Sequence, residues 1–274
     1  MRTFSMLRTH RITTILAAAI AFAAPAAARA QIAVLSSTVE EKTAAPGEKY
    51  TGTIVISNQS AQPQIARIYQ TDYSFASDGT AHYDDAGSSK RSNARWITPQ
   101  ASRVVVPPNS QVAVPYAVAV PLGDSLRGTY WSMVMVEGAP VEPGTPSGSK
   151  PAVAIGAVMR YAVQLATHIR DSGSRTVQFA SAGAVKAPNG AAALDIDVTD
   201  TGERGYRPVL WVEVYDAQGT LRAKAKQTRG LLYPGTSLHQ HFDLGTLPSG
   251  TYKAVVFADT GEDAVFATQY TVNY

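Results

Sequence analysis

The sequence lacks cysteine, long apolar runs beyond its first thirty residues, and clusters of basic residues. Without cysteine, disulfides cannot staple the fold, so apolar cores alone must stabilise it. Beyond residue 30, no apolar run approaches the roughly 18 residues that span a membrane as a helix. We therefore expect no membrane span in the mature chain. Four of the 24 basic residues lie in the first thirty, which leaves 20 basic against 21 acidic residues. This near-neutral balance gives no reason to expect nucleic-acid binding.

The first thirty residues have the pattern of a secretory signal peptide. A start with three arginines precedes an apolar run over residues 12–24, and Ala28-Arg29-Ala30 supplies the small residues that signal peptidase requires. The apolar run is too short to cross a bilayer of roughly 30 Å as a helix. We therefore expect cleavage of residues 1–30 and export to the periplasm, with a secreted or surface-associated product as the alternative.

Helical periodicity is hard to find after residue 30, whereas short runs rich in Val, Ile, Thr and Tyr recur between Gly, Pro, Asn and Asp. Thr53–Ile56 stops at Ser57-Asn58, and Ile65–Tyr73 stops near Ser77-Asp78-Gly79. Such runs between turn residues are typical of strands in an antiparallel sandwich. The pattern predicts an all-β fold of two tandem immunoglobulin-like β-sandwich domains.

Two domains are expected because the chain repeats its turn residues at low similarity. In each half, one turn opens a strand, a proline ends it, and a Gly-Thr-Tyr opens the next strand. The matching segments are Pro108-Asn109-Ser110, Pro121 and Gly128-Thr129-Tyr130 in the first half, and Pro234-Gly235-Thr236, Pro248 and Gly250-Thr251-Tyr252 in the second. We place domain 1 at residues 31–169, a short hinge at 170–175, and domain 2 at 176–274.

Domain 1 also contains a Pro/Gly-rich stretch at residues 137–151, expected to be a loop. It leads into a segment, 154–169, whose alternate positions form an apolar face. That face consists of Ile155, Ala157, Met159, Tyr161, Val163 and Leu165. At roughly fourteen residues, the predicted strand exceeds the usual length of about five or six. Its apolar face is either a surface that binds a partner or the core of domain 1 itself.

The combination of these features resembles the periplasmic pilus-assembly chaperones. It includes the signal peptide, two Ig-like domains without cysteine, the loop before a long last strand of domain 1, and Trp96-Ile97-Thr98-Pro99 followed by Val104–Pro108. The resemblance implies that the long strand completes the sandwich of a fibre subunit by β-strand addition. Its partners would be a β-rich fibre or pilus subunit and an outer-membrane usher. The implied partner-binding residues are Ile155, Met159, Tyr161, Val163 and Leu165.

The sequence departs from this family at the basic pair that holds the carboxylate of the subunit. The matching positions fall at Gln164 and near Val39 or Glu40, none of which is basic. Lys42 and Arg160 lie nearby and are the candidate substitutes for a carboxylate anchor. Solvated surface charges are the simpler interpretation of both.

Motifs for catalysis or metal binding are weak, so we expect that the protein is not an enzyme and that it has neither a cofactor nor a metal site. No Gly-x-Ser-x-Gly and no phosphate-binding loop is present. Asp195 and Asp197, like His239 and His241, share one strand face without a third ligand, and Asp84-Asp85 lacks the spacing of a calcium loop. The alternative function is a structural or adhesive module of the cell envelope that binds surface proteins or peptidoglycan, because residues 52–73 and Trp96-Ile97 also resemble such sandwich domains.

Overall fold

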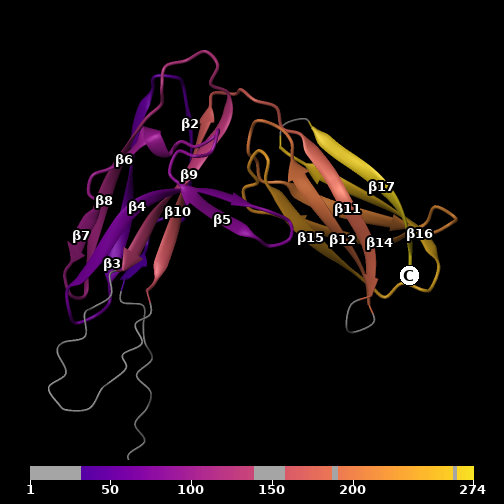
Figure 1. The fold of residues 1–274 in the computed structure, drawn as a ribbon. Helices are drawn as coiled ribbons and strands as arrows, with labels where there is room; N and C mark the ends of the chain where they lie inside the picture. Colours follow the sequence, from indigo (N-terminus) through magenta and orange to yellow (C-terminus); the bar gives the residue numbers. More distant parts are fainter. Residues whose placement is uncertain (1–31, 139–157, 187–190, 262–263) are drawn as a thin grey trace, which may run out of the picture.

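The structure is a computed structural model that describes residues 32–138, 158–186, 191–261 and 264–274. Strands and one short 3-10 helix make up its regular structure and form two β-sandwiches (Figure 1). The predicted signal peptide and most of the predicted loop at 137–151 lie outside the described residues.

The first sandwich contains the strands of residues 32–169. They are β1 (Ile32–Val34), β2 (Val39–Ala44), β3 (Lys49–Asn58), β4 (Gln64–Phe75), β5 (Ala81–Asp85), β6 (Ile97–Pro99), β7 (Arg103–Val106), β8 (Ser110–Ala119), β9 (Gly128–Gly138) and β10 (Arg160–Ile169), with the 3-10 helix η1 (Ala94–Trp96) before β6. One sheet has the order β1-β3-β8-β6, and the other has the order β2-β10-β9-β4-β5 with β7 paired to β4. Neighbouring strands are antiparallel except β2 and β10, which are parallel.

Alternation of side chains explains how the two sheets face each other. In β8, Val114, Tyr116 and Val118 point inward and are buried, whereas the residues between them are exposed. A strand with this period of two buries one face and leaves the other in water. The inward side chains of both sheets meet in one core cluster, to which β10 contributes Val163 and Leu165.

The second sandwich contains the strands of residues 177–273. They are β11 (Val177–Lys186), β12 (Ala192–Asp200), β13 (Val209–Tyr215), β14 (Leu221–Thr228), β15 (Ser237–Gly245), β16 (Thr251–Asp259) and β17 (Val265–Asn273). Its sheets have the orders β11-β12-β15 and β14-β13-β16-β17, and a separate apolar core lies between them.

The two sandwiches share a strand arrangement. In the first, β3 pairs with β8 and β4 pairs with β9, while in the second β12 pairs with β15 and β13 pairs with β16. Of these eight strands, β8, β9, β15 and β16 are the ones that the repeated turn residues delimit in the sequence. The predicted all-β class with tandem immunoglobulin-like sandwiches is thus confirmed.

The segment predicted as a hinge, residues 170–175, is hydrogen-bonded to the second sandwich. The Arg170 carbonyl accepts from Arg204 Nη1 at 2.5 Å, and the Ser174 carbonyl accepts from the Glu203 amide at 2.8 Å. Gly128 adopts φ of +75°, and a Cβ there would lie 1.9 Å from the Glu203 carbonyl oxygen. Only glycine allows this approach without a shift. The junction is therefore closely packed.

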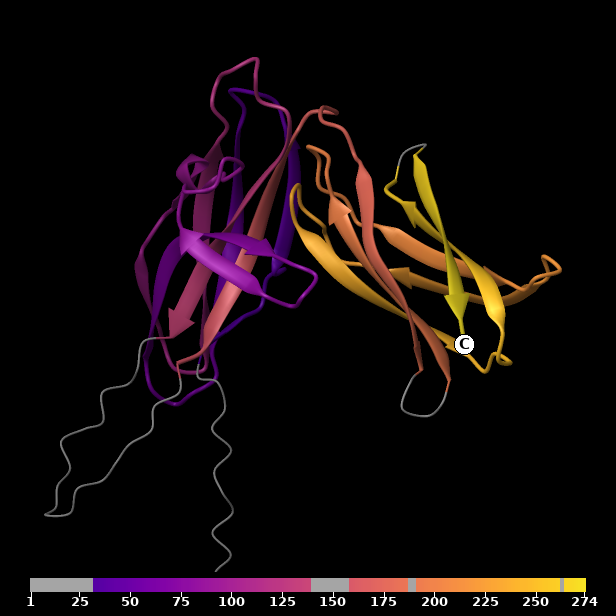
Figure 2. The same cartoon turned by 45° about the vertical axis from the view of Figure 1, so that its right-hand side comes forward.

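A hairpin of the first sandwich also reaches the second. Figure 2 shows the β4–β5 hairpin extending toward the second sandwich. At its turn, the Ser77 amide donates to Ser237 Oγ at 2.9 Å. Phe75, at the end of β4, packs against the core of the second sandwich. The two sandwiches thus contact each other through side chains as well as through the connecting segment.

Candidate functional site: the open edge of β10 and the junction

Part of β10 has a neighbour on one side only. It pairs with β9 along its whole length, Arg160–Ile169, but with β2 only from Gln164 to Ile169. Among the described residues, 160–163 therefore have a free edge on the β2 side. The Gln164 amide donates to the Thr38 carbonyl at 2.8 Å, so even-numbered residues direct their main-chain groups toward this side. Arg160 and Ala162 thus present N–H and C=O groups that another strand can pair with.

The apolar face of β10 passes from core to surface as it approaches this edge. Leu165 and Val163 are 3% and 0% exposed and lie in the core of the first sandwich. Tyr161, on the same face, packs against that core while remaining half-buried. Met159, just before the strand, is 45% exposed. The same row of side chains is therefore domain core at one end and accessible at the other.

The described residues for which we predicted partner binding therefore fall into two groups, one buried in the first sandwich and one accessible to a partner. The described strand begins at Arg160 rather than at residue 154, and Ile155 lies outside the described residues. Val163 and Leu165 are enclosed by their own sandwich, which is the second of the two interpretations drawn from the sequence. Of the described candidates, Met159 and Tyr161 are accessible to a partner.

Lys42 and Arg160 do not form one basic site. Lys42 lies opposite Thr167 in the β2–β10 register, seven positions along β10 from Arg160, a separation of roughly 23 Å along a strand. Arg160 Nε donates to Glu137 Oε2 at 2.6 Å across the β9–β10 pair. Both side chains are exposed. Lys42 and Arg160 therefore do not converge on one point, as two cations that hold a single carboxylate would have to.

The outward face of β10 contacts the second sandwich through an aromatic seam. The rings of Trp131 and Tyr233 stack with centroids 4.5 Å apart and an interplanar angle of 9°. Together with Ala166 and Leu231 they form a buried cluster between the sandwiches. Tyr233 Oη donates to Gln164 Oε1 at 2.9 Å, so Gln164 contributes to the contact between the sandwiches.

A charged network beside the seam also joins the two parts. Glu41 on β2 accepts from Arg207 of the second sandwich and lies 3.3 Å from His168 Nε2. His168 Nδ1 is 2.7 Å from Thr129 Oγ1, which in turn accepts from the Gly205 amide at 2.8 Å. Hydrogen bonding to His168, followed by that to Arg207, lowers the pKa of Glu41 to about 2 against opposing desolvation. The sequence does not predict this network, because its members are far apart along the chain.

The histidines and aspartates noted in the sequence pair with each other on one exposed sheet face. His239 Nδ1 lies 2.8 Å from Asp197 Oδ1, and His241 Nδ1 lies 2.5 Å from Asp195 Oδ1. Within the described residues, no group of three His, Asp or Glu side chains is placed to hold a metal ion. Asp84 and Asp85 lie on β5, where every residue is exposed.

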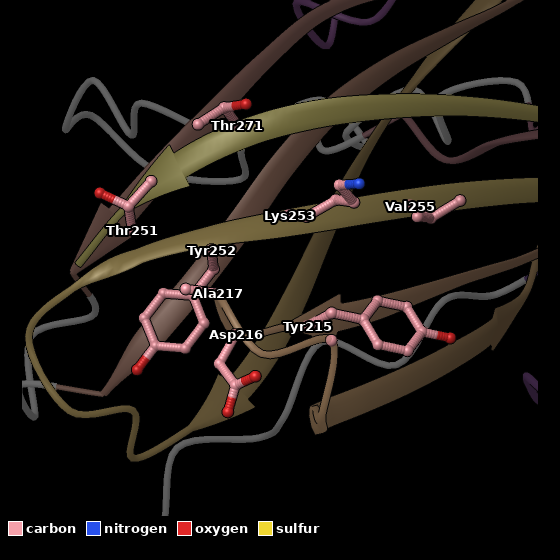
Figure 3. Close-up of a pocket in the computed structure, with 9 residues that line it drawn as sticks. Tyr215, Asp216, Ala217, Thr251, Tyr252, Lys253, Val255 and Thr271 are labelled. Carbon is pink, nitrogen blue, oxygen red and sulfur yellow. The ribbon is translucent and has the colours of Figure 1, made fainter.

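The outer surface of the second sandwich carries a cavity of about 540 Å³ (Figure 3). Tyr215 and Asp216 line one side of the cavity. Thr251 and Lys253 on β16 and Thr271 on β17 line the other side. The Asp216 carboxylate already accepts from Arg222 Nε at 2.6 Å and from the Thr220 amide. Asp216, the acidic residue of the cavity lining, thus already has hydrogen-bond partners in its own sandwich. The cavity is also separate from both the aromatic seam and the open edge of β10.

The fold defines the class of the molecule as a tandem immunoglobulin-like β-sandwich protein. No helix among the described residues is long and apolar enough to cross a membrane. No protein-family model matches the sequence, and no curated protein matches it.

Solved structures to which the chain is similar include fimbrial chaperones and their complexes. One is the chaperone–tip adhesin complex of CFA/I fimbriae biogenesis, at 11% identity over 89% of this chain and 99% of that chain, with a TM-score of 0.47. Another is the class 5 fimbriae chaperone CfaA, at 10% identity over 87% and 98%, with a TM-score of 0.46. A third is the CsuC–CsuE chaperone–tip adhesion subunit complex of Acinetobacter baumannii, at 11% identity over 77% and 90%, with a TM-score of 0.43.

Proposed function

We propose that the protein is a periplasmic chaperone-like protein that binds β-rich fibre subunits by strand addition at the open edge of β10. Residues 1–30 would direct export and be removed. The observation that carries the proposal is the free edge at Arg160 and Ala162, beside the accessible apolar side chains of Met159 and Tyr161.

Main-chain groups at this edge supply affinity that does not depend on the sequence of the partner. A strand laid beside residues 160–163 gains ladder hydrogen bonds with the even-numbered residues, as in other β-augmentation complexes. Met159 and Tyr161 lie on the face that continues the core, so a partner whose own sandwich is open can bury them. Fully burying one such side chain stabilises by roughly 1.5–3 kcal/mol. Backbone pairing and apolar burial thus act at the same short segment.

The main-chain contribution is tested by Ala162→Pro. Proline removes an N–H that faces the free edge rather than β9, and strands tolerate proline where the N–H faces solvent. We expect the variant to melt within a few degrees of the unmodified protein and to lose capture of a β-rich partner from envelope extracts, with the captured protein identified by mass spectrometry.

The apolar contribution is tested by Met159→Glu, matched with Val265→Glu. Val265 begins β17 and is 54% exposed, so it resembles Met159 in exposure but lies in the second sandwich. We expect Met159→Glu to weaken capture and Val265→Glu to leave it unchanged. Val163→Glu should unfold the first sandwich, because it places a charge in the core.

The proposal fails if Ala162→Pro captures as much partner as the unmodified protein while remaining folded. It also fails if the unmodified protein recovers no β-rich partner. In that case the envelope-module alternative is tested directly, by sedimentation of the protein with purified peptidoglycan.

A further inference from the structure

Four charged residues form one row across the larger sheet of the first sandwich. The strand registers pair Arg103 with Arg67, Arg67 with Glu137, and Glu137 with Arg160. Residues paired in this way project from the same face of a sheet at intervals of about 4.8 Å. The row, here called the arginine row, therefore sets three guanidinium groups and one carboxylate side by side on β7, β4, β9 and β10.

The single carboxylate of the arginine row is already fully engaged. Glu137 accepts from Arg160 at 2.6 Å and from Tyr69 Oη at 3.1 Å, and it lies 3.6 Å from Arg67 Nη1. The hydrogen bond from Arg160 is the largest cause of a lowered pKa at Glu137. The Arg67 and Arg160 side chains nevertheless remain 64% and 61% exposed. Because the row contains three arginines and one glutamate, it keeps two positive charges that its own carboxylate does not balance.

The arginine row ends at the open edge of β10. Arg160 is its last member, and the main-chain groups of Arg160 face that edge. A strand added there would place one of its residues directly opposite Arg160 and extend the row by one position. Opposite charges in such a cross-strand position are favourable, and like charges are not.

We propose that the arginine row selects a partner strand with an aspartate or glutamate opposite Arg160. The inference rests on the proposed strand addition and adds the chemistry of the preferred partner to it. Arg160 would contact the acid directly. Arg67 lies two strands further away, roughly 10 Å from Arg160, which is comparable to the Debye length of about 8 Å at physiological ionic strength. Arg103 lies still further. The contribution to selectivity should therefore fall in the order Arg160, Arg67, Arg103.

Two synthetic strand peptides of alternating valine and threonine, identical except for a central Glu or Gln, provide the test. Fluorescence anisotropy would measure their binding to the full mature protein. We expect the Glu peptide to bind about two- to fivefold more tightly at low salt, the range of one cross-strand charge pair. This preference should disappear at high salt, while the affinity for the Gln peptide changes little.

Arg160→Gln should abolish the preference, and Arg67→Gln should reduce it less. The matched control is Arg127→Gln, because Arg127 is 60% exposed and pairs with Glu203 at 2.9 Å at the other end of the sandwich. A preference that survives Arg160→Gln, or that Arg127→Gln removes equally, would overturn the inference. Equal binding of both peptides would also overturn the inference, but it would leave the proposal of strand addition standing. Failure of both peptides to bind would overturn strand addition together with the inference.

Discussion

Replacing the buried Asp200 with asparagine should stabilise the protein at alkaline pH. Asp200 ends β12 and is 0% exposed. Its Oδ1 accepts from the Gly202 amide at 2.7 Å, but among the described residues Oδ2 has no hydrogen-bond partner. Burial is the largest cause of a pKa raised from 3.8 to about 7, which the Gly202 amide and the charge of Arg91 offset only in part. The ionised carboxylate is therefore poorly accommodated.

The sign of the pH dependence follows from this pKa. Between pH 3.8 and about 7 the folded protein holds a proton at Asp200 that the unfolded chain has released. Folding stability therefore falls as the pH rises through that window, and the full penalty is present above it. A shift of about three pKa units corresponds to at most about 4 kcal/mol, at 1.36 kcal/mol per unit. Asparagine has the shape of the neutral acid and cannot ionise.

Urea unfolding at pH 5, 6, 7 and 8, followed by tryptophan fluorescence, measures the effect. We expect the midpoint of Asp200→Asn to exceed that of the unmodified protein at pH 8 and the difference to shrink toward pH 5. Asp243→Asn is the matched control, because Asp243 also accepts from the amide two residues later but is exposed on β15. Parallel pH profiles for the unmodified protein and Asp200→Asn would refute the reasoning.

Three further predictions concern the junction, the second sandwich and the leader. Glu41→Gln should destabilise the protein by about 1 kcal/mol at neutral pH, since solvent screens a half-exposed network. Because the pKa of Glu41 is lowered from 4.5 to about 2, this difference should be present above pH 4.5 and vanish as the pH falls toward 2 in chemical-unfolding curves. Residues 176–274 expressed alone should give a β-type circular dichroism spectrum and a cooperative melt, and a disordered product would contradict their independence as a domain. N-terminal sequencing of envelope material should begin at Gln31, and retention of Met1 in most molecules would contradict export by a cleaved leader.

The sequence was sufficient to predict the fold class, because the physical signals of strands and turns are local. Gly128 and Pro234 delimit strands through their own backbone preferences, and alternation along β8 follows from the period of two of any strand. The repeat of these signals in both halves predicted two sandwiches. Because the chain has no cysteine, the sequence also determined that apolar cores, and not disulfides, hold each sandwich together.

The tertiary structure decided which residues of β10 can meet a partner. Alternation alone marks Met159, Tyr161, Val163 and Leu165 as equivalent, since each occupies the same face of the strand. Whether that face is core or surface depends on how far the opposite sheet and β2 extend beside it, and the extent of β2 alongside β10 sets where the free edge begins. The same holds for the arginine row, whose members acquire a common position only through the registers of four strands. Cross-strand register is a property of the folded sheet and leaves no local pattern in the sequence.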